Sequence, residues 1–182
     1  HIHDMNSENM GLPVRYVIGN HDYVDGEYGE ELFESIYGPV WYSFEVGNVH
    51  YVVTPFQNGA DRESGYDQDD RWRWLENDLK NTAPGMKVVV LNHNKPESSN
   101  YVMEFDQKSL DLKKYNLIAW VHGHYHYNYV QNNNGILNIS TARPDCGGID
   151  SSASGSRIIS IDTEGKISTR MRYYDFVNEQ AK

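Results

Sequence analysis

The chain has 182 residues and a formal net charge of −10 at pH 7. This length supports one domain with a substantial core and is short for two. The acidic balance excludes a general binder of nucleic-acid backbones, because such proteins need basic surface to displace counterions. No apolar run approaches the roughly 20 residues of a membrane-spanning helix. We therefore expect a single domain over residues 1–182 that neither binds nucleic-acid backbones nor spans a membrane.

Cys146 is the only cysteine, so no disulfide can form within the chain. A reactive thiol needs an electropositive setting, and the neighbouring sequence does not supply one. We therefore interpret Cys146 as an incidental loop thiol. The composition is rich in Tyr, Asn, Gly and Ser and sparing in Lys. This usage weakly favours an extracytoplasmic bacterial protein, either periplasmic or secreted.

Hydrophobic patterns predict the elements of the first part of the chain. β-Branched apolar runs predict strands, and apolar residues three or four positions apart predict helices. The two-residue turn Gly47-Asn48 between two apolar runs predicts a β-hairpin. In chain order we expect a strand over 14–18, a helix over 29–36, a hairpin of 41–46 with 49–54, and a polar loop over 55–65.

The clearest helical pattern covers residues 67–79. Three aspartates among its first four residues place negative charge at the N-terminus, where unpaired N–H groups and the helix dipole favour anions. Trp72, Leu75 and Leu79 form one apolar stripe. Such a stripe is more typical of a core-facing helix than of a platform for a ligand.

The second part of the chain changes from strand–helix alternation to hairpins. We expect a buried strand over 87–91, a helix around 107–114, a strand over 117–121, a hairpin of 127–130 with 136–139, a loop over 146–156, and a hairpin of 157–161 with 166–172. Alternation followed by hairpins predicts an α/β fold with a sheet-on-sheet core flanked by helices.

Three short histidine-containing segments each follow a predicted strand. They are Gly19–Asp22 after 14–18, Asn92-His93 after 87–91, and His122–His126 after 117–121. In open α/β sheets, ligands bind at the carboxyl ends of the strands. His124 and His126 project to the same side if their segment is extended, and Gly123 allows close approach of the backbone. The pattern predicts a metal site; a surface histidine cluster or an adventitious site is the alternative.

The order Gly-Asn-His-Asp, lone His93 and Gly-His-x-His resembles the calcineurin-like metallophosphoesterases. The resemblance runs from about Val14 to Tyr173, and residues 38–44 also look like secreted bacterial and purple-acid-type members. It implies two stacked mixed β-sheets flanked by helices. It also implies hydrolysis of a phosphoester at two divalent metal ions, for which Zn, Fe or Mn suit the donors.

The resemblance assigns roles to individual residues. Asn20, His93 and His124 would bind the second metal, and His126 would bind the first. His21 would be catalytic: it would protonate the leaving alkoxide or orient the substrate phosphate, tasks suited to imidazole.

Other candidates have roles that the pattern leaves open. Asp22 would either hold the His21 ring or cap the following turn. His122 fits a structural role at the end of a strand or behind the ligands, and His50 fits a structural role within its hairpin. Arg143 would either contact a phosphate or lie on the surface, as most arginines do.

The family pattern also includes an Asp-x-His strand end and a Gly-Asp-x-x-Asp segment, which supply most ligands of the first metal and the bridging carboxylate. Only eighteen residues precede Gly19, and they contain neither pattern. We therefore expect an incomplete, N-terminally truncated domain that binds at most about one metal ion and has little activity alone. The alternative is a non-catalytic binding or structural module. An incomplete sheet would promote strand swapping, homo-oligomerisation or marginal stability. The identity of the phosphoester stays open.

Overall fold

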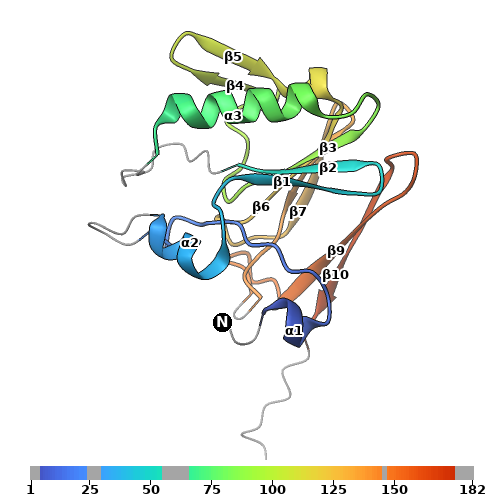
Figure 1. Cartoon of the computed structure of the whole chain (residues 1–182). Coiled ribbons are helices and arrows are strands. Elements are labelled where there is room, and N and C mark those ends of the chain that lie inside the picture. The colour runs from blue at the N-terminus through green and yellow to red at the C-terminus, as the bar shows by residue number, and fades with distance from the viewer. Residues whose placement is uncertain (1–4, 24–29, 55–65, 145–146, 175–182) are drawn as a thin grey trace, which may run out of the picture.

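The computed structural model describes residues 5–23, 30–54, 66–144 and 147–174 (Figure 1). The strands within these ranges are β1 (Tyr42–Val46), β2 (Val49–Val53), β3 (Lys87–Leu91), β4 (Val102–Phe105), β5 (Lys108–Asp111), β6 (Leu117–His122), β7 (Tyr129–Asn133), β8 (Ile136–Ser140), β9 (Gly155–Ile161) and β10 (Ile167–Tyr173). The helices are α1 (Ser7–Met10), α2 (Glu31–Tyr37), α3 (Gln68–Asn81) and the 3-10 helix η1 (Leu112–Tyr115).

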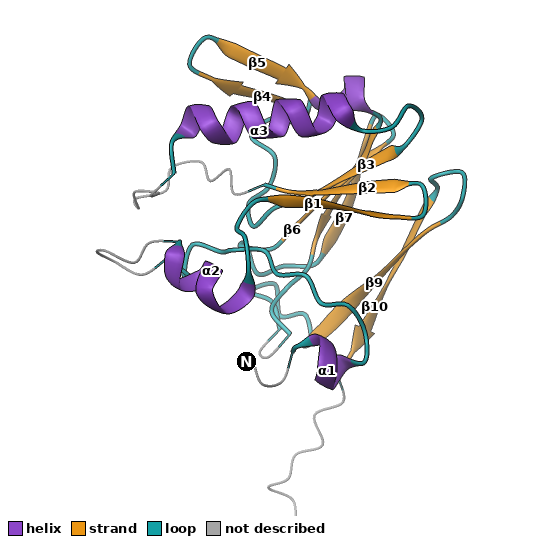
Figure 2. Ribbon diagram, viewed as in Figure 1, coloured by secondary structure: helices purple, strands orange, loops and turns teal. Residues whose placement is uncertain are grey.

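A mixed six-stranded sheet in the order β1-β2-β3-β6-β8-β7 forms the centre of the fold (Figure 2). Strands β2, β3, β6 and β8 run parallel to one another, and β1 and β7 pair antiparallel at the two edges. Parallel strands need cover on both faces, which explains the continuous apolar run of β3. The carboxyl ends of the four parallel strands consequently meet at one edge of the sheet.

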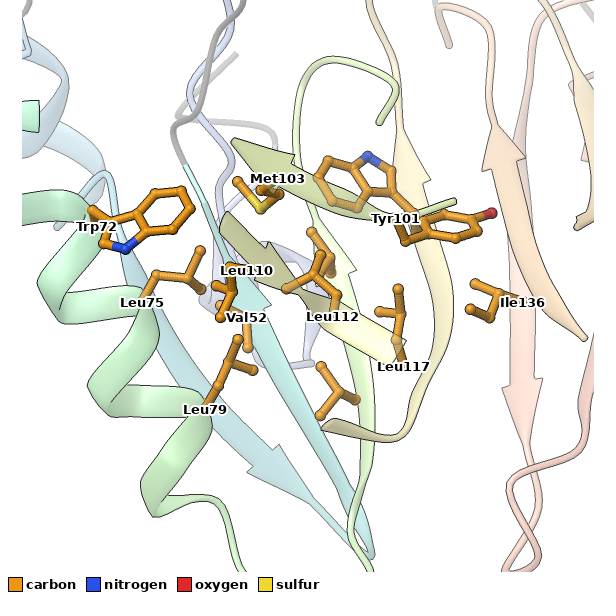
Figure 3. Packing of buried hydrophobic residues seen from close by; sticks show 13 residues of the cluster. Val52, Trp72, Leu75, Leu79, Tyr101, Met103, Leu110, Leu112, Leu117 and Ile136 are labelled. Carbon is orange, nitrogen blue, oxygen red and sulfur yellow. The ribbon is translucent and has the colours of Figure 1, made fainter. Parts of the chain in front are cut away.

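Each face of this sheet has its own apolar cover. Alternate residues of β3 point to opposite faces: Val88 and Val90 belong to the cluster with α3 and the β4–β5 hairpin, and Val89 belongs to the cluster with β9 and β10. Figure 3 shows the first cluster, in which Trp72, Leu75 and Leu79 lie against Val52 and Leu110. The predicted α/β architecture of stacked sheets with helical cover is therefore confirmed.

Helix α3 begins where the aspartates predict. The side chain of Asp67 accepts a hydrogen bond from Asp69 N at 2.6 Å and caps the helix. The stripe of Trp72, Leu75 and Leu79 is buried, as predicted. Arg71 is also buried on this helix, which the apolar pattern did not predict.

Both central hairpins confirm their predictions. The β1–β2 hairpin turns at Gly47-Asn48, and β7–β8 turns at Asn134-Gly135. Asn134 and Gly135 both have positive φ angles, of 55° and 92°. Two-residue turns of this kind match the right-handed twist of the strands, and asparagine followed by glycine tolerates those angles best. The hairpin of β9 with β10 is also present.

The helix predicted around 107–114 is wrong. Its first part is strand β5, which pairs with β4 in an antiparallel hairpin, and only η1 is helical. Leu110 of β5 pairs with Met103 of β4 and both are buried; Leu112 at the start of η1 and Tyr101 just before β4 are also buried, each two positions away. That spacing is the period of a strand, not of a helix.

The strand predicted over 14–18 is also wrong. This run forms no ladder within the described part of the chain. Val14 N donates to Ser7 Oγ at 3.0 Å, and Tyr16 O accepts from the Tyr42 hydroxyl at 2.8 Å, so side chains partner the backbone here. An apolar run becomes a strand only where a neighbour offers free N–H and C=O groups.

Two further expectations cannot be compared with the structure. The loop over 55–65 and the thiol Cys146 lie outside the described residues. Across the described ranges, no helix has the length and apolar character needed to cross a bilayer.

Candidate metal centre

The parallel ladder of β3 and β6 continues past the ends of both strands. Asn92 N donates to Val121 O at 3.0 Å, and Gly123 N donates to His93 O at 3.2 Å. These two bonds hold the residue after β3 beside the residues after β6. His93 and His124 therefore lie next to each other because their strands are neighbours in the sheet.

Asn92 fixes the end of β3 from within the protein. It is 3% exposed, and its Nδ2 donates to both the carbonyl and the Oγ1 of Thr54, each at 2.8 Å. Its Oδ1 accepts from Asn94 N at 2.7 Å. A buried amide with these partners locks the backbone on both sides of His93. The sequence marked Asn92 only as a neighbour of His93, although a polar residue ending an apolar run was a usable signal.

Donor atoms from three segments converge on one atom. Asn20 Oδ1 lies 2.8 Å from His93 Nε2, and His124 Nδ1 lies 3.1 Å from the same nitrogen. The His93 and His124 rings are 4.9 Å apart between centroids and tilted by 74°. Three predicted ligands, Asn20, His93 and His124, are thus brought together by the fold.

The separation of 3.1 Å between His93 Nε2 and His124 Nδ1 fits donors that share one cation, and the 2.8 Å between His93 Nε2 and Asn20 Oδ1 is slightly shorter. Ligands bound at about 2.1 Å from an ion lie about 3.0 Å apart at a right angle and about 3.4 Å apart in a tetrahedron. A hydrogen on His93 Nε2 can point at only one of Asn20 Oδ1 and His124 Nδ1 at a time. A divalent ion would satisfy all three atoms at once.

The donor set consists of two imidazoles and one amide. Within the described ranges, no group of three or more His, Cys, Asp or Glu side chains could hold a metal. An amide oxygen beside two imidazole nitrogens is a set that divalent ions accept.

Gly19 permits the close approach of the first segment to His93. A Cβ at Gly19 would lie 3.0 Å from both Cε1 and Nδ1 of His93, which is tighter than ordinary contact. A Cβ at Gly123 would lie 4.0 Å from His93 Nδ1, an ordinary contact. Gly123 was predicted to allow close approach of the backbone, but a side chain there would make only an ordinary contact; Gly19 is the position of close approach to His93.

The imidazoles at the centre are held in their neutral form. Burial, followed by the charges of His124 and His21, lowers the pKa of His93 to about 4. Burial, followed by His126 and His21, also lowers the pKa of His124. Neutral imidazole is the form that binds a metal. The same interactions place His21 and His126 within electrostatic range of the convergent atoms.

The segment from His124 to His126 is not extended. His124 has a φ of 64° and His126 a φ of 52°, and both are therefore left-handed. The expectation that an extended backbone aligns these two side chains is wrong. Non-glycine residues with positive φ are uncommon and cluster at functional sites. The His126 carbonyl accepts from Ile149 N at 2.7 Å, which holds this bent segment in place.

Asp22 closes the turn that carries Asn20 and His21. Asp22 Oδ2 accepts from Gly19 N at 2.7 Å, and Asp22 N donates to Gly19 O at 3.0 Å. These two bonds close the turn that ends at Asp22; the two predicted roles, holding the His21 ring and capping the following turn, both stay predictions. His21 itself is exposed at the rim.

His122 lies behind the convergent ligands. Its Nε2 accepts from the Tyr129 hydroxyl at 2.9 Å, and its Nδ1 donates to Gly123 O at 3.1 Å. Burial raises the pKa of Tyr129 to about 12 and lowers the pKa of His122, so this pattern of protons persists at neutral pH. His122 thereby supports the peptide from which His124 projects, in agreement with a structural role.

The two remaining candidates lie elsewhere. His50 is buried, and its Nε2 lies 2.8 Å from Asp78 Oδ2, which ties the β1–β2 hairpin to α3. Arg143 is exposed, and its backbone forms an isolated bridge with Gly147.

The protein has a largely parallel α/β sheet with imidazole and amide donors at its carboxyl edge, which places it among α/β proteins with a candidate metal site at that edge. The family model of the calcineurin-like phosphoesterases matches residues 2–128, and the chain belongs to this family. The family is named for the hydrolysis of phosphoesters. No curated protein matches the sequence.

Two solved structures show similarity to the chain. One is a purple acid phosphatase from seeds of yellow lupin (Lupinus luteus), with 15% identity, a TM-score of 0.45, and coverage of 89% of this chain and 35% of that chain. The other is a putative 5'-nucleotidase from Staphylococcus aureus, with 14% identity, a TM-score of 0.37, and coverage of 72% and 28%. The chain thus spans about a third of the length of these proteins.

The close approach at Gly19 predicts a shift in the titration of His93. Gly19→Ala should shift the His93 ring by a few tenths of an ångström and loosen its burial, so the His93 pKa should rise above its value of about 4. Gly123→Ala is the matched control and should leave the value near that of the unaltered protein. NMR titration of the ring protons measures both. Equal titration of His93 in the two variants would contradict the packing role of Gly19.

The depressed pKa of His93 also predicts a pH dependence of stability. Between about pH 6.5 and pH 4, the unfolded chain binds a proton that folded His93 does not bind. The free energy of unfolding of the metal-free protein should therefore fall as the pH is lowered through this window. Urea denaturation in the presence of a chelator measures this dependence. His93→Gln should flatten it, and an unchanged slope in that variant would exclude His93 as a source.

Proposed function

We propose that this chain supplies the second-metal half of a two-metal phosphoesterase site. Asn20, His93 and His124 bind the second divalent cation, and His126 is one ligand of the first. The observation that carries the proposal is the approach of Asn20 Oδ1 and His124 Nδ1 to the same atom, His93 Nε2. Zn, Fe and Mn suit imidazole nitrogen with an oxygen donor.

The protein atoms at this centre set the charge that a substrate meets. Divalent ions in such a site stabilise charge on phosphoryl oxygens and lower the pKa of water. Two neutral imidazoles and an amide add no negative charge, so the full charge of the ion faces the phosphate. This local positive potential is compatible with a net charge of −10, because a bound ion is the largest local charge in a site.

We assign proton transfer to His21. It is exposed at the rim, and its charge reaches both His93 and His124. Imidazole is the side chain most often used as a general acid. His21 would give its proton to the leaving alkoxide or orient the phosphate, and the turn closed by Asp22 would hold it there.

The remaining ligands of the first metal come from outside this sequence in this proposal. The Asp-x-His and Gly-Asp-x-x-Asp patterns do not occur in the 182 residues. Catalysis then belongs to a protein that carries these patterns together with this sequence. The chain alone would bind one cation and would hydrolyse phosphoesters barely above background.

Metal titration tests the ligand assignment. The chain should bind about one Zn or Mn ion with useful affinity. His93→Ala and His124→Ala should each abolish this binding, since each removes one of three protein donors. His50→Ala is the control and should leave the affinity almost unchanged, because His50 pairs with Asp78 instead. Two tight, equivalent ions in the chain alone, or none, would contradict the proposal.

Activity tests the role of His21. In a longer protein that contains both missing patterns, His21→Ala should lower the hydrolysis rate by roughly 10²–10⁴-fold, the usual worth of a positioned general acid. The metal content should stay near that of the unaltered protein, because His21 is not assigned as a ligand. Loss of metal in this variant would refute its role in proton transfer. A fully metallated longer protein without activity on any phosphoester would favour a non-catalytic module.

A further inference from the structure

A buried ionic cluster follows the turn Gly19–Asp22 in the chain. Glu30 is 1% exposed and Arg71 is 3% exposed, and Arg71 Nη2 donates to Glu30 Oε1 at 2.9 Å. The hydroxyl of Tyr23 donates to the same Oε1 at 3.3 Å. Tyr23 is the first residue after the turn. One carboxylate oxygen therefore joins the turn, the start of α2 and the buried face of α3.

The turn has few attachments of its own to the sheet. The run that leads into it forms no ladder within the described residues, and the bonds between Gly19 and Asp22 close the turn on itself. Ile18 before the turn and Tyr23 after it are buried in the same small apolar cluster. Apolar contact fixes the depth of these side chains, but it is not directional.

The hydrogen bond from the Tyr23 hydroxyl to the Glu30 carboxylate adds a directional contact that apolar packing does not provide. Hydrogen bonds depend on angle, and an ionised acceptor strengthens them, so even this bond of 3.3 Å favours one orientation of the Tyr23 ring. A buried ion pair adds little to stability compared with apolar residues of the same volume, and its best-attested use is to specify a position. The Glu30–Arg71 pair is therefore suited to fixing the position of Tyr23 and of the turn before it.

We propose that Tyr23, Glu30 and Arg71 are positioning residues that hold Asn20 and His21 at the metal centre. They touch neither the ion nor the substrate; Tyr23 acts through the turn, and Glu30 and Arg71 act through Tyr23. The proposal rests on the proposed function, because the role of Asn20 as a ligand belongs to it.

Another side-chain contact of α3 with a different element provides the matched comparison. Asp78 lies two turns further along this helix, and its carboxylate contacts His50 Nε2 at 2.8 Å and Ser43 Oγ at 2.6 Å. This contact ties α3 to the β1–β2 hairpin instead of to the turn. Its loss should loosen the fold without moving Asn20.

The experiment measures Zn affinity and amide exchange in the same 182-residue chain. Tyr23→Phe removes one hydroxyl and keeps the ring packed, with Tyr101→Phe as its control, since the Tyr101 hydroxyl contacts Asn133 instead. A double variant, Glu30→Met with Arg71→Met, removes both charges and keeps the volume, with Asp78→Asn as its control. Urea denaturation records the stability of each variant.

Tyr23→Phe and the double variant should lower Zn affinity by about tenfold or more, as for residues that orient metal ligands. Without metal, the amides of Gly19 and Asp22 should exchange faster in these two variants, because their mutual bonds open more often. Both controls should keep the affinity and exchange of the unaltered chain. The double variant should remain folded, since apolar residues can replace a buried pair.

Three results would overturn the inference. The first is unchanged affinity and exchange in Tyr23→Phe. The second is an equal loss of affinity in the two controls, which would indicate general loosening. The third is unchanged exchange at Gly19 and Asp22 in a double variant that remains folded. If the unaltered chain binds no Zn, the proposed function fails, and the exchange measurement still tests the positioning of the turn.

Discussion

The candidate centre depends on the hydrogen bond from Gly123 N to His93 O, which extends the β3–β6 ladder beyond the strands. Parallel pairing sends both strands to the same edge, and this bond keeps their next residues in register. His93 and His124 meet because of it. Asn92 and His122 support the two sides of the same bond from within the protein.

The third donor reaches this edge in a different way. Asn20 belongs to a turn outside the sheet, and it meets His93 only because Gly19 has no side chain there. Ile18 before the turn and Tyr23 after it are buried in one small apolar cluster, which holds the turn from both sides. The centre thus combines a rigid half, set by the sheet, with a half that depends on packing. Substitutions elsewhere in the chain should therefore change the position of Asn20 more readily than that of His93.

Local signals predicted much of the fold. The turn Gly47-Asn48 and the capping residue Asp67 act within a few residues, and the structure has the hairpin and the helix where they indicate. The failures arose where distant partners decide the outcome. The run 14–18 lacks a neighbouring strand within the described residues, and Leu110 is buried in a hairpin that local composition does not reveal.

The sequence predicted which residues form the site, but it did not predict how they are arranged in space. Asn20, His93 and His124 were identifiable because each follows an apolar run, in an order that resembles a known family. Their meeting needed the sheet order, which no local pattern contains. The left-handed backbone of His124 and the close approach at Gly19 both depend on contacts between segments far apart in sequence.

The claim that these three donors share one cation is tested most directly by X-ray absorption of the chain loaded with one equivalent of Zn. The account predicts two imidazole nitrogens at about 2.0–2.1 Å, with the other ligands being oxygen. His93→Ala and His124→Ala should each lose the ion, so that no bound Zn is detected. A first shell made only of oxygen, or one containing sulfur, would contradict the account.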